Sequence, residues 1–235
     1  MNGINRRQIL EWTVMASSAL AIGAGCGSSS GATGASSGSG GSDGSGGSSS
    51  GSDDVTQLNG LLALEYLGID AYTAGAGILG KPPSGDPLAA LAPTLLKVAV
   101  HFQQQHKDHA TAIEAAVKAA GGKPIDASSV SFQLPTGFKP SITNVLKLAA
   151  NAEKGAALSY AQVVSKMSAV DDRFLATAIS GDESQHFIVL YVILKGIAQP
   201  GMNIASMTDA IVQASFVAGV GSFSGLDEVP DLAYS

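Results

Sequence analysis

Glutamate and histidine side chains recur at helical spacing in two similar sets along this chain. In each set a Glu and a Tyr seven residues apart are followed, further along, by a segment with the spacing His/Glu-x-x-His. The first set comprises Glu65, Tyr72, His106, His109 and Ile113, and the second comprises Glu153, Tyr160, Glu183, His186 and Leu190. Because residues three, four or seven positions apart lie on one face of an α-helix, each pair presents its side chains to the same side. The pattern predicts an internal repeat of two helical hairpins.

Carboxylates and imidazoles on the apolar faces of helices favour metal binding. An unpaired carboxylate costs much free energy to bury, and a divalent or trivalent cation offsets that cost. Carboxylate oxygens and neutral imidazoles suit iron, manganese and zinc, and a histidine three residues after a glutamate presents both ligands to one side of a helix. Glu183 and His186 have this spacing. A polar, hydrogen-bonded core without metal remains the alternative.

Hydrophobic periodicity predicts an all-α fold with four helices. The helices are expected over residues 54–77, 93–120, 141–168 and 172–196. Asp54 and Ser141 are the expected N-caps of the first and third helices, and Phe174 is expected to face inward from the fourth. Gly121-Gly122 should end the second helix, and the proline-containing stretch 123–140 should be an extended connection. These elements predict an antiparallel four-helix bundle with a long crossover between helices two and three.

The sequence over about 54–196 resembles the ferritin-like superfamily, particularly the secreted bacterial ferritin-like group that includes desiccation-related proteins. The resemblance depends on Glu65, Glu153, Glu183-Ser184-Gln185-His186, His106-Lys107-Asp108-His109 and Gly121-Gly122-Lys123-Pro124. It implies a ferritin-like bundle that holds two iron ions in its core. Glu65 and Glu153 would be terminal ligands, and Glu183 would bridge the two ions. His109 and His186 would be the imidazole ligands.

His106 is a departure from the family pattern, because it stands where a second bridging glutamate is expected. Three carboxylates leave one positive charge in excess beside two divalent ions, so a site for one ion, iron or manganese, becomes competitive. A register that pairs Gln103 with His106 is a weaker alternative, since it places a neutral amide where the carboxylate should be. Tyr72 and Tyr160 are expected beside the metal ligands and could tune the site through their hydroxyls, but core packing is the preferred interpretation for each.

The N-terminal part of the chain has the features of an export signal. Residues 1–25 place Arg6-Arg7 before a short apolar stretch, which resembles a twin-arginine signal peptide. Cys26 follows in a lipoprotein-like cleavage box and is the expected site of lipidation, although cleavage after Ala21 is an alternative. Residues 26–52 form a linker in which 22 of the 26 residues after Cys26 are Gly or Ser. Such a coil spans roughly 28 Å, which would hold the domain clear of a membrane.

Composition excludes several classes of function. The net charge of −6 argues against a nucleic-acid binder, because such proteins need a basic surface. A single Cys excludes an internal disulfide framework and a Cys-based zinc site. Residues 53–198 are expected to form the domain, and 199–235 a tail with a short helix near 206–217. The sequence therefore predicts a metal-binding protein of the cell envelope, on the periplasmic side, tethered by lipid and acting as a monomer or homodimer.

Two functions of different classes are compatible with these features. The first is a metal-dependent oxidoreductase that reacts ferrous ion with oxygen or peroxide. The second is a non-catalytic envelope bundle, serving stress protection or docking, that has lost the centre of two metal ions. His106 is the feature that favours the second function.

Overall fold

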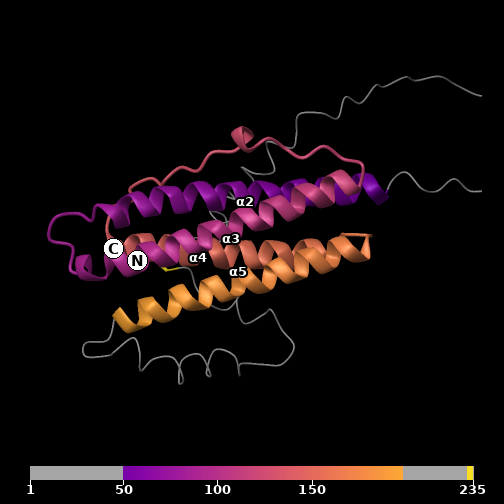
Figure 1. The fold of residues 1–235 in the computed structure, drawn as a ribbon. Coiled ribbons are helices and arrows are strands. Elements are labelled where there is room, and N and C mark those ends of the chain that lie inside the picture. Colours follow the sequence, from indigo (N-terminus) through magenta and orange to yellow (C-terminus); the bar gives the residue numbers. More distant parts are fainter. Residues whose placement is uncertain (1–49, 198–231, 235) are drawn as a thin grey trace, which may run out of the picture.

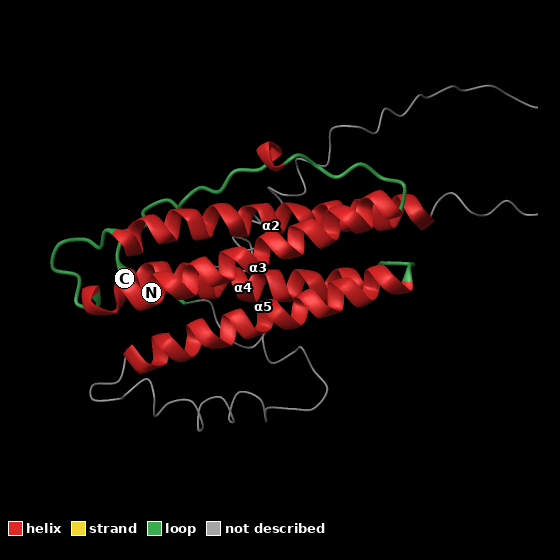
Figure 2. Cartoon of the chain, in the orientation of Figure 1, coloured by secondary structure: helices red, strands yellow, loops and turns green. Residues whose placement is uncertain are grey.

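The computed structural model describes residues 50–197 and 232–234, which form an all-α bundle (Figure 1). Its long helices are α2 (Ser50–Gly80), α3 (Ala92–Ala119), α4 (Ile142–Val164) and α5 (Val170–Ile197). Two short 3-10 helices, η1 (Ala89–Leu91) and η2 (Ala127–Ser129), lie in the connections. Within the described ranges there is no β-strand (Figure 2). The predicted four-helix fold is confirmed.

The bundle consists of two antiparallel hairpins joined by a long crossover. Helix α2 packs mainly on α3, and α4 packs mainly on α5. The segment between α3 and α4 runs back along α2 to the far end of the bundle (Figure 1). Asn59 of α2 fixes this segment, because its side chain donates to the carbonyl of Lys123 and accepts from the amide of Ile125. The crossover thereby brings the second hairpin alongside the first.

Local sequence explains where α3 ends and α4 begins. The amide of Gly122 donates to the carbonyl of Val117 and the amide of Gly121 to that of Lys118, which is the Schellman arrangement. Gly121 has a φ of 75°, a left-handed conformation that suits glycine. Ser141 caps α4 as predicted, since its hydroxyl accepts from the amide of Asn144 at 3.1 Å.

Three expectations about the helices are wrong. Helix α2 begins at Ser50, so Asp54 lies inside it and does not cap it. The Asp54 carboxylate instead accepts from the backbone amides of Ser168 and Ala169, at 2.7 and 2.8 Å, just before α5. Helix α4 ends at Val164 and not at residue 168. Phe174 is 75% exposed, because the buried face of α5 passes through residues 172, 176, 179 and 183.

Several predicted segments lie outside the described residues. These are the signal peptide, Cys26, the linker up to residue 49 and the short helix near 206–217. The described C-terminal residues return to α4, where the backbone of Leu232 exchanges two hydrogen bonds with the Asn151 side chain. None of the helices in the described ranges is long and apolar enough to cross a membrane.

Two apolar clusters form the core, one toward each end of the bundle. One contains Tyr72, Phe102, Ile142, Leu146 and Leu190, with their neighbours. The other contains Leu58, Leu62, Ile113, Tyr160 and Ile179, with their neighbours. On every helix, the glutamates and histidines singled out above lie between the residues of one cluster and those of the other. The core thus encloses a polar layer at mid-height and shields it from water at both ends.

Candidate metal centre

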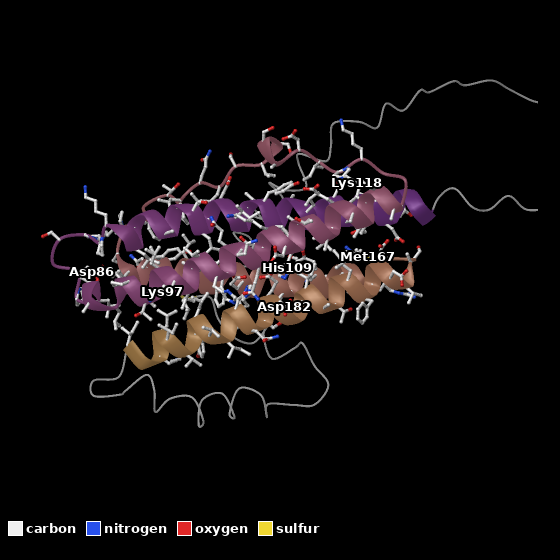
Figure 3. All side chains as sticks on the ribbon, viewed as in Figure 1. Asp86, Lys97, His109, Lys118, Met167 and Asp182 are labelled. Atoms are coloured by element: carbon white, nitrogen blue, oxygen red, sulfur yellow. The ribbon has the colours of Figure 1, made fainter. Side chains whose placement is uncertain are left out.

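All six predicted ligands meet in this polar layer. Helix α2 supplies one glutamate, α3 two histidines, α4 one glutamate, and α5 one glutamate and one histidine. Each is at most 8% exposed, and the residues are Glu65, His106, His109, Glu153, Glu183 and His186. Figure 3 shows His109 midway along the bundle. His106 and His109 thus both lie in the polar layer, whereas Gln103 lies elsewhere and its amide donates to the carbonyl of Ile69.

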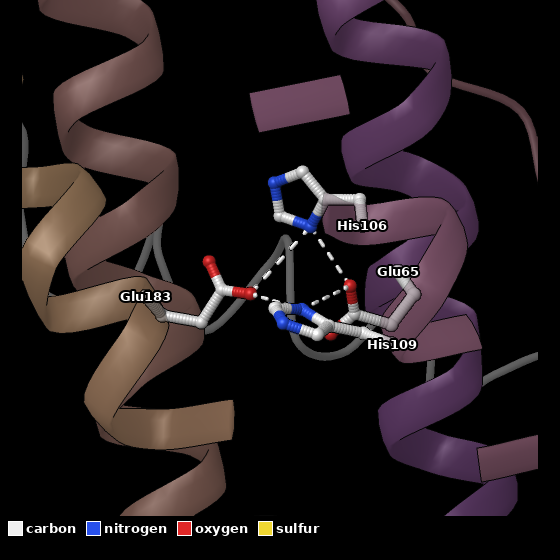
Figure 4. A group of neighbouring side chains, drawn as sticks. All are labelled: Glu65, His106, His109 and Glu183. Atoms are coloured by element: carbon white, nitrogen blue, oxygen red, sulfur yellow. Dashed lines mark hydrogen bonds and ion pairs between the residues drawn. The ribbon is translucent and has the colours of Figure 1, made fainter. Parts of the chain in front are cut away.

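The first group of side chains joins α2, α3 and α5 (Figure 4). Nδ1 of His106 lies 2.8 Å from Oε2 of Glu65 and 3.5 Å from Oε1 of Glu183. Nδ1 of His109 lies 3.1 Å from the same Glu183 oxygen and 3.5 Å from the same Glu65 oxygen. Two imidazole nitrogens and two carboxylate oxygens thus face one another around a common point, as metal ligands do.

The second group joins α3, α4 and α5, and it contains three buried polar atoms without a hydrogen bond. They are Oε2 of Glu153, Oε2 of Glu183 and Nδ1 of His186. Nδ1 of His186 lies 3.5 Å from the Glu153 oxygen and 3.4 Å from the Glu183 oxygen. Because buried polar atoms are nearly always satisfied, three such atoms aimed at one another mark a place where a bound group fits. A metal cation has the chemistry of such a partner, since both carboxylates and a neutral imidazole nitrogen can coordinate it.

His106 and Glu183 belong to both groups. His106 directs Nδ1 toward Glu65 and Nε2 toward Glu153, whose Oε1 lies 3.3 Å away. An imidazole therefore occupies the position between the two terminal glutamates, where the family resemblance placed a bridging carboxylate.

The two tyrosines hold the terminal glutamates from opposite sides. Tyr72 of α2 donates to Oε1 of Glu153 on α4, and Tyr160 of α4 donates to Oε1 of Glu65 on α2. These two reciprocal hydrogen bonds follow the internal repeat. They leave the other oxygen of each carboxylate directed at the imidazoles. Tyr72 and Tyr160 are thus more than packing residues, because they orient the carboxylates.

A second pair of reciprocal side-chain contacts, between α3 and α5, holds two of the histidines and was not predicted from the sequence. Oδ2 of Asp182 lies 3.4 Å from Nε2 of His109, and Oε1 of Gln105 lies 3.0 Å from Nε2 of His186. Both oxygens accept, so Nε2 carries the hydrogen in each ring and Nδ1 faces the carboxylates. Such outer partners fix the tautomer and orientation of metal-binding histidines. Gln105 and Asp182 immediately precede His106 and Glu183, and this matching position in the repeat could have indicated them.

Gly68 is the other residue that sequence reasoning missed. A Cβ atom at this position would lie 3.0 Å from Nδ1 of His106 and 3.1 Å from Cε1 of the same ring. Gly68 follows Glu65 by three residues, and the equivalent residue after Glu153 is Ala156. Glycine therefore stands in the half of the repeat where the ring of His106 needs space.

The comparison with known families agrees with this architecture. The sequence pattern of the ferritin-like domain family matches residues 53–195. The chain belongs to this family. A conserved hypothetical protein from Mycobacterium tuberculosis has a similar solved structure, with a TM-score of 0.51 and 22% sequence identity. The match covers 62% of this chain and 100% of that one, and at this identity it supports the fold alone. No curated protein matches the chain.

The ionisable groups of this ferritin-like domain stabilise one another electrostatically. Burial lowers the pKa of His109 and of His186, but the neighbouring glutamate carboxylates outweigh it and raise the values to about 10 and about 9. The pKa of His106 is also raised, because the charges of Glu153 and Glu183 outweigh its burial.

The glutamates respond in different directions. Burial raises the pKa of Glu65 and Glu153, but the neighbouring histidines outweigh it and lower both values. Burial and the charge of Glu153 raise the pKa of Glu183 to about 7. Without metal, protons on the three histidines therefore balance the carboxylates, and a cation that binds here must displace protons.

Proposed function

We propose that this protein is an exported, membrane-tethered ferritin-like protein that binds iron or a similar metal in its core and uses it to oxidise ferrous ion or to consume oxygen or peroxide. The observation that carries the proposal is the trio of unsatisfied buried atoms on Glu153, Glu183 and His186. Membership of a family whose fold often binds iron supports the choice of metal. Export and tethering rest on the signal-like sequence up to Cys26.

The donor set fits a metal ion at one position directly and at a second position after loss of protons. At the first, Glu153, Glu183 and His186 would hold the ion through the three atoms that have no other partner. At the second, Glu65, His106, His109 and Glu183 supply the ligand atoms. The second group is satisfied by its own hydrogen bonds, so its occupation requires that His106 and His109 exchange those bonds for metal. We expect the first position to fill before the second.

A bound iron would supply the electron transfer that oxidation of ferrous ion or reduction of oxygen requires. The protein supplies the geometry for it. Tyr72 and Tyr160 keep one oxygen of each terminal glutamate turned inward. Phe102 stacks on the ring of His186 with centroids 4.0 Å apart and so helps to fix its orientation. Glu183, whose pKa is about 7 in the metal-free protein, would lose its proton when the ion binds, because a coordinating carboxylate is ionised.

Elemental analysis tests this proposal. The purified protein should contain bound iron or manganese, and a Glu153→Ala, Glu183→Ala double variant should lose it. Glu114→Ala is the matched control, because Glu114 lies on α3 away from the cluster, paired with Tyr66 and Lys118. The control should keep its metal. Equal metal content in the protein and the double variant, or none in either after reconstitution with ferrous ion, would contradict the proposal.

One observation favours a second function, a non-catalytic envelope bundle. His106 contacts Glu65 and Glu153 directly and satisfies part of the cluster without metal. A protein of this kind would show the same thermal stability with chelator and with added metal, whereas the first proposal expects added metal to raise the melting temperature.

A further inference from the structure

A pocket of about 170 Å³ lies between α3 and α5, on the outer side of the ligand cluster. Its wall includes His101 and Gln105 from α3 and Asp182 and Gln185 from α5, and His186 lies at its base. His101 and Gln185 are exposed, whereas His186 is only 2% exposed. The pocket therefore leads from solvent to a buried ligand.

The polar atoms around this pocket are those of a cation path. The Asp182 side chain is 46% exposed, and its Oδ2 also contacts Nε2 of His109 at 3.4 Å. Gln105 extends its Oε1 to Nε2 of His186. A carboxylate and an amide oxygen, each in contact with an inner histidine, thus connect solvent with both ligand groups. Oxygen and nitrogen atoms of this kind bind first-row divalent cations.

We propose that this pocket is the port through which divalent cations reach the cluster, with Asp182 and Gln105 as the residues that receive them. The inference rests on the proposed function, since a port requires a metal site behind it. Asp182 attracts the cation by its charge, and the two apolar clusters toward the ends of the bundle disfavour the passage of an ion there. The positions of Asp182 and His109 are labelled in Figure 3.

A substitution at the rim of the pocket tests the proposal without touching a ligand. Gln185 lines the pocket and is exposed, so Gln185→Trp should fold and partly fill it. Gln162→Trp is the control, because Gln162 is an exposed residue of α4 outside the pocket. Cobalt(II) is the probe, since its visible absorption changes when it is coordinated, and stopped-flow mixing follows its uptake and its release to a chelator.

A port has a kinetic signature that a structural role does not share. Gln185→Trp should slow uptake and release of cobalt by the same factor and leave the dissociation constant unchanged, while Gln162→Trp should match the unmodified protein. Asp182→Asn should slow uptake on the order of threefold or more at low ionic strength, with a smaller effect at high salt. Asp70→Asn removes a charge from the exposed face of α2 and should leave the rate of cobalt uptake unchanged.

The outcomes separate this proposal from the proposed function. If the unmodified protein binds cobalt but Gln185→Trp exchanges it at the unmodified rate, the port is refuted and the metal site stands. If Gln185→Trp leaves cobalt exchange unchanged but slows the reaction of preloaded ferrous protein with oxygen, the pocket admits the oxidant and the cation port is refuted. If the unmodified protein takes up no cobalt, both proposals are refuted.

Discussion

Gly68 lies against the ring of His106, so a substitution that adds one methyl group there tests the contact directly. In Gly68→Ala the new Cβ would lie 3.0 Å from Nδ1 of His106, against 3.4–4 Å for an ordinary contact. The ring must shift by several tenths of an ångström, although Glu65 holds the same nitrogen at 2.8 Å. Gly77→Ala is the matched control, because Gly77 lies on the same helix and a Cβ there would meet nothing within 4 Å.

The two variants should differ in stability by an amount that these contacts set. Alanine in place of glycine stabilises a helix interior by about 0.5–1 kcal/mol, so Gly77→Ala should gain this much. Gly68→Ala has the same gain, but overpacking of the buried ring costs about 1–3 kcal/mol. We therefore expect Gly68→Ala to be roughly 1–3 kcal/mol less stable than Gly77→Ala in urea unfolding. It should also bind cobalt more weakly, since His106 is displaced.

A double-mutant cycle with His106→Ala refutes or supports the reasoning. With the imidazole removed, the Gly68→Ala penalty should disappear, and the variant should then be stabilised as Gly77→Ala is. Equal stability of the two single variants would contradict the account, as would a penalty that persists in the His106→Ala background.

Three other predictions concern charge and capping. The folded-state pKa values of His109 and His186, about 10 and about 9, exceed the ordinary value of 6.5, so their stabilising contribution is complete below pH 6.5 and is lost as pH rises to 10. The melting temperature of the metal-free protein should therefore fall between pH 6.5 and pH 10. A flat profile would contradict the assigned contacts. Metal must displace protons from these histidines, so calorimetric titration with manganese(II) in buffers of different ionisation enthalpy should show proton release. The affinity for manganese(II) should rise from pH 6 to 8. Binding without proton release would place the metal elsewhere. Asp54→Ala removes the carboxylate that accepts from the amides of Ser168 and Ala169, and it should lower the free energy of unfolding in urea by about 0.5–2 kcal/mol. Asp53 is an exposed neighbour, so Asp53→Ala should cost less. Equal losses in the two variants would refute the capping role.

The sequence alone was sufficient for the parts of the structure that depend on helical periodicity. Glu65, His106, Glu153 and Glu183 could be placed in one core because their spacing matches between the two halves of the chain. The Schellman end of α3 followed in the same way from Gly121-Gly122, a local signal.

The features that were missed depend on contacts between helices. Asp54 has the composition of an N-cap, but the amides that it binds belong to a segment over a hundred residues away. Asp182 and Gln105 look like ordinary surface residues until the hairpins pack and bring them to His109 and His186. Gly68 has a role only because the ring of His106 crosses from α3. Single-helix patterns contain none of this information.

The central claim is that a metal ion binds between Glu153, Glu183 and His186, and anomalous diffraction from crystals grown with manganese(II) tests it most directly. The account predicts an anomalous peak within about 2.0–2.4 Å of Oε2 of Glu153, Oε2 of Glu183 and Nδ1 of His186, the distances typical of such ligands. The peak should be absent from crystals of Glu153→Ala, Glu183→Ala. Peaks confined to surface carboxylates, with these three atoms still without a partner, would contradict it.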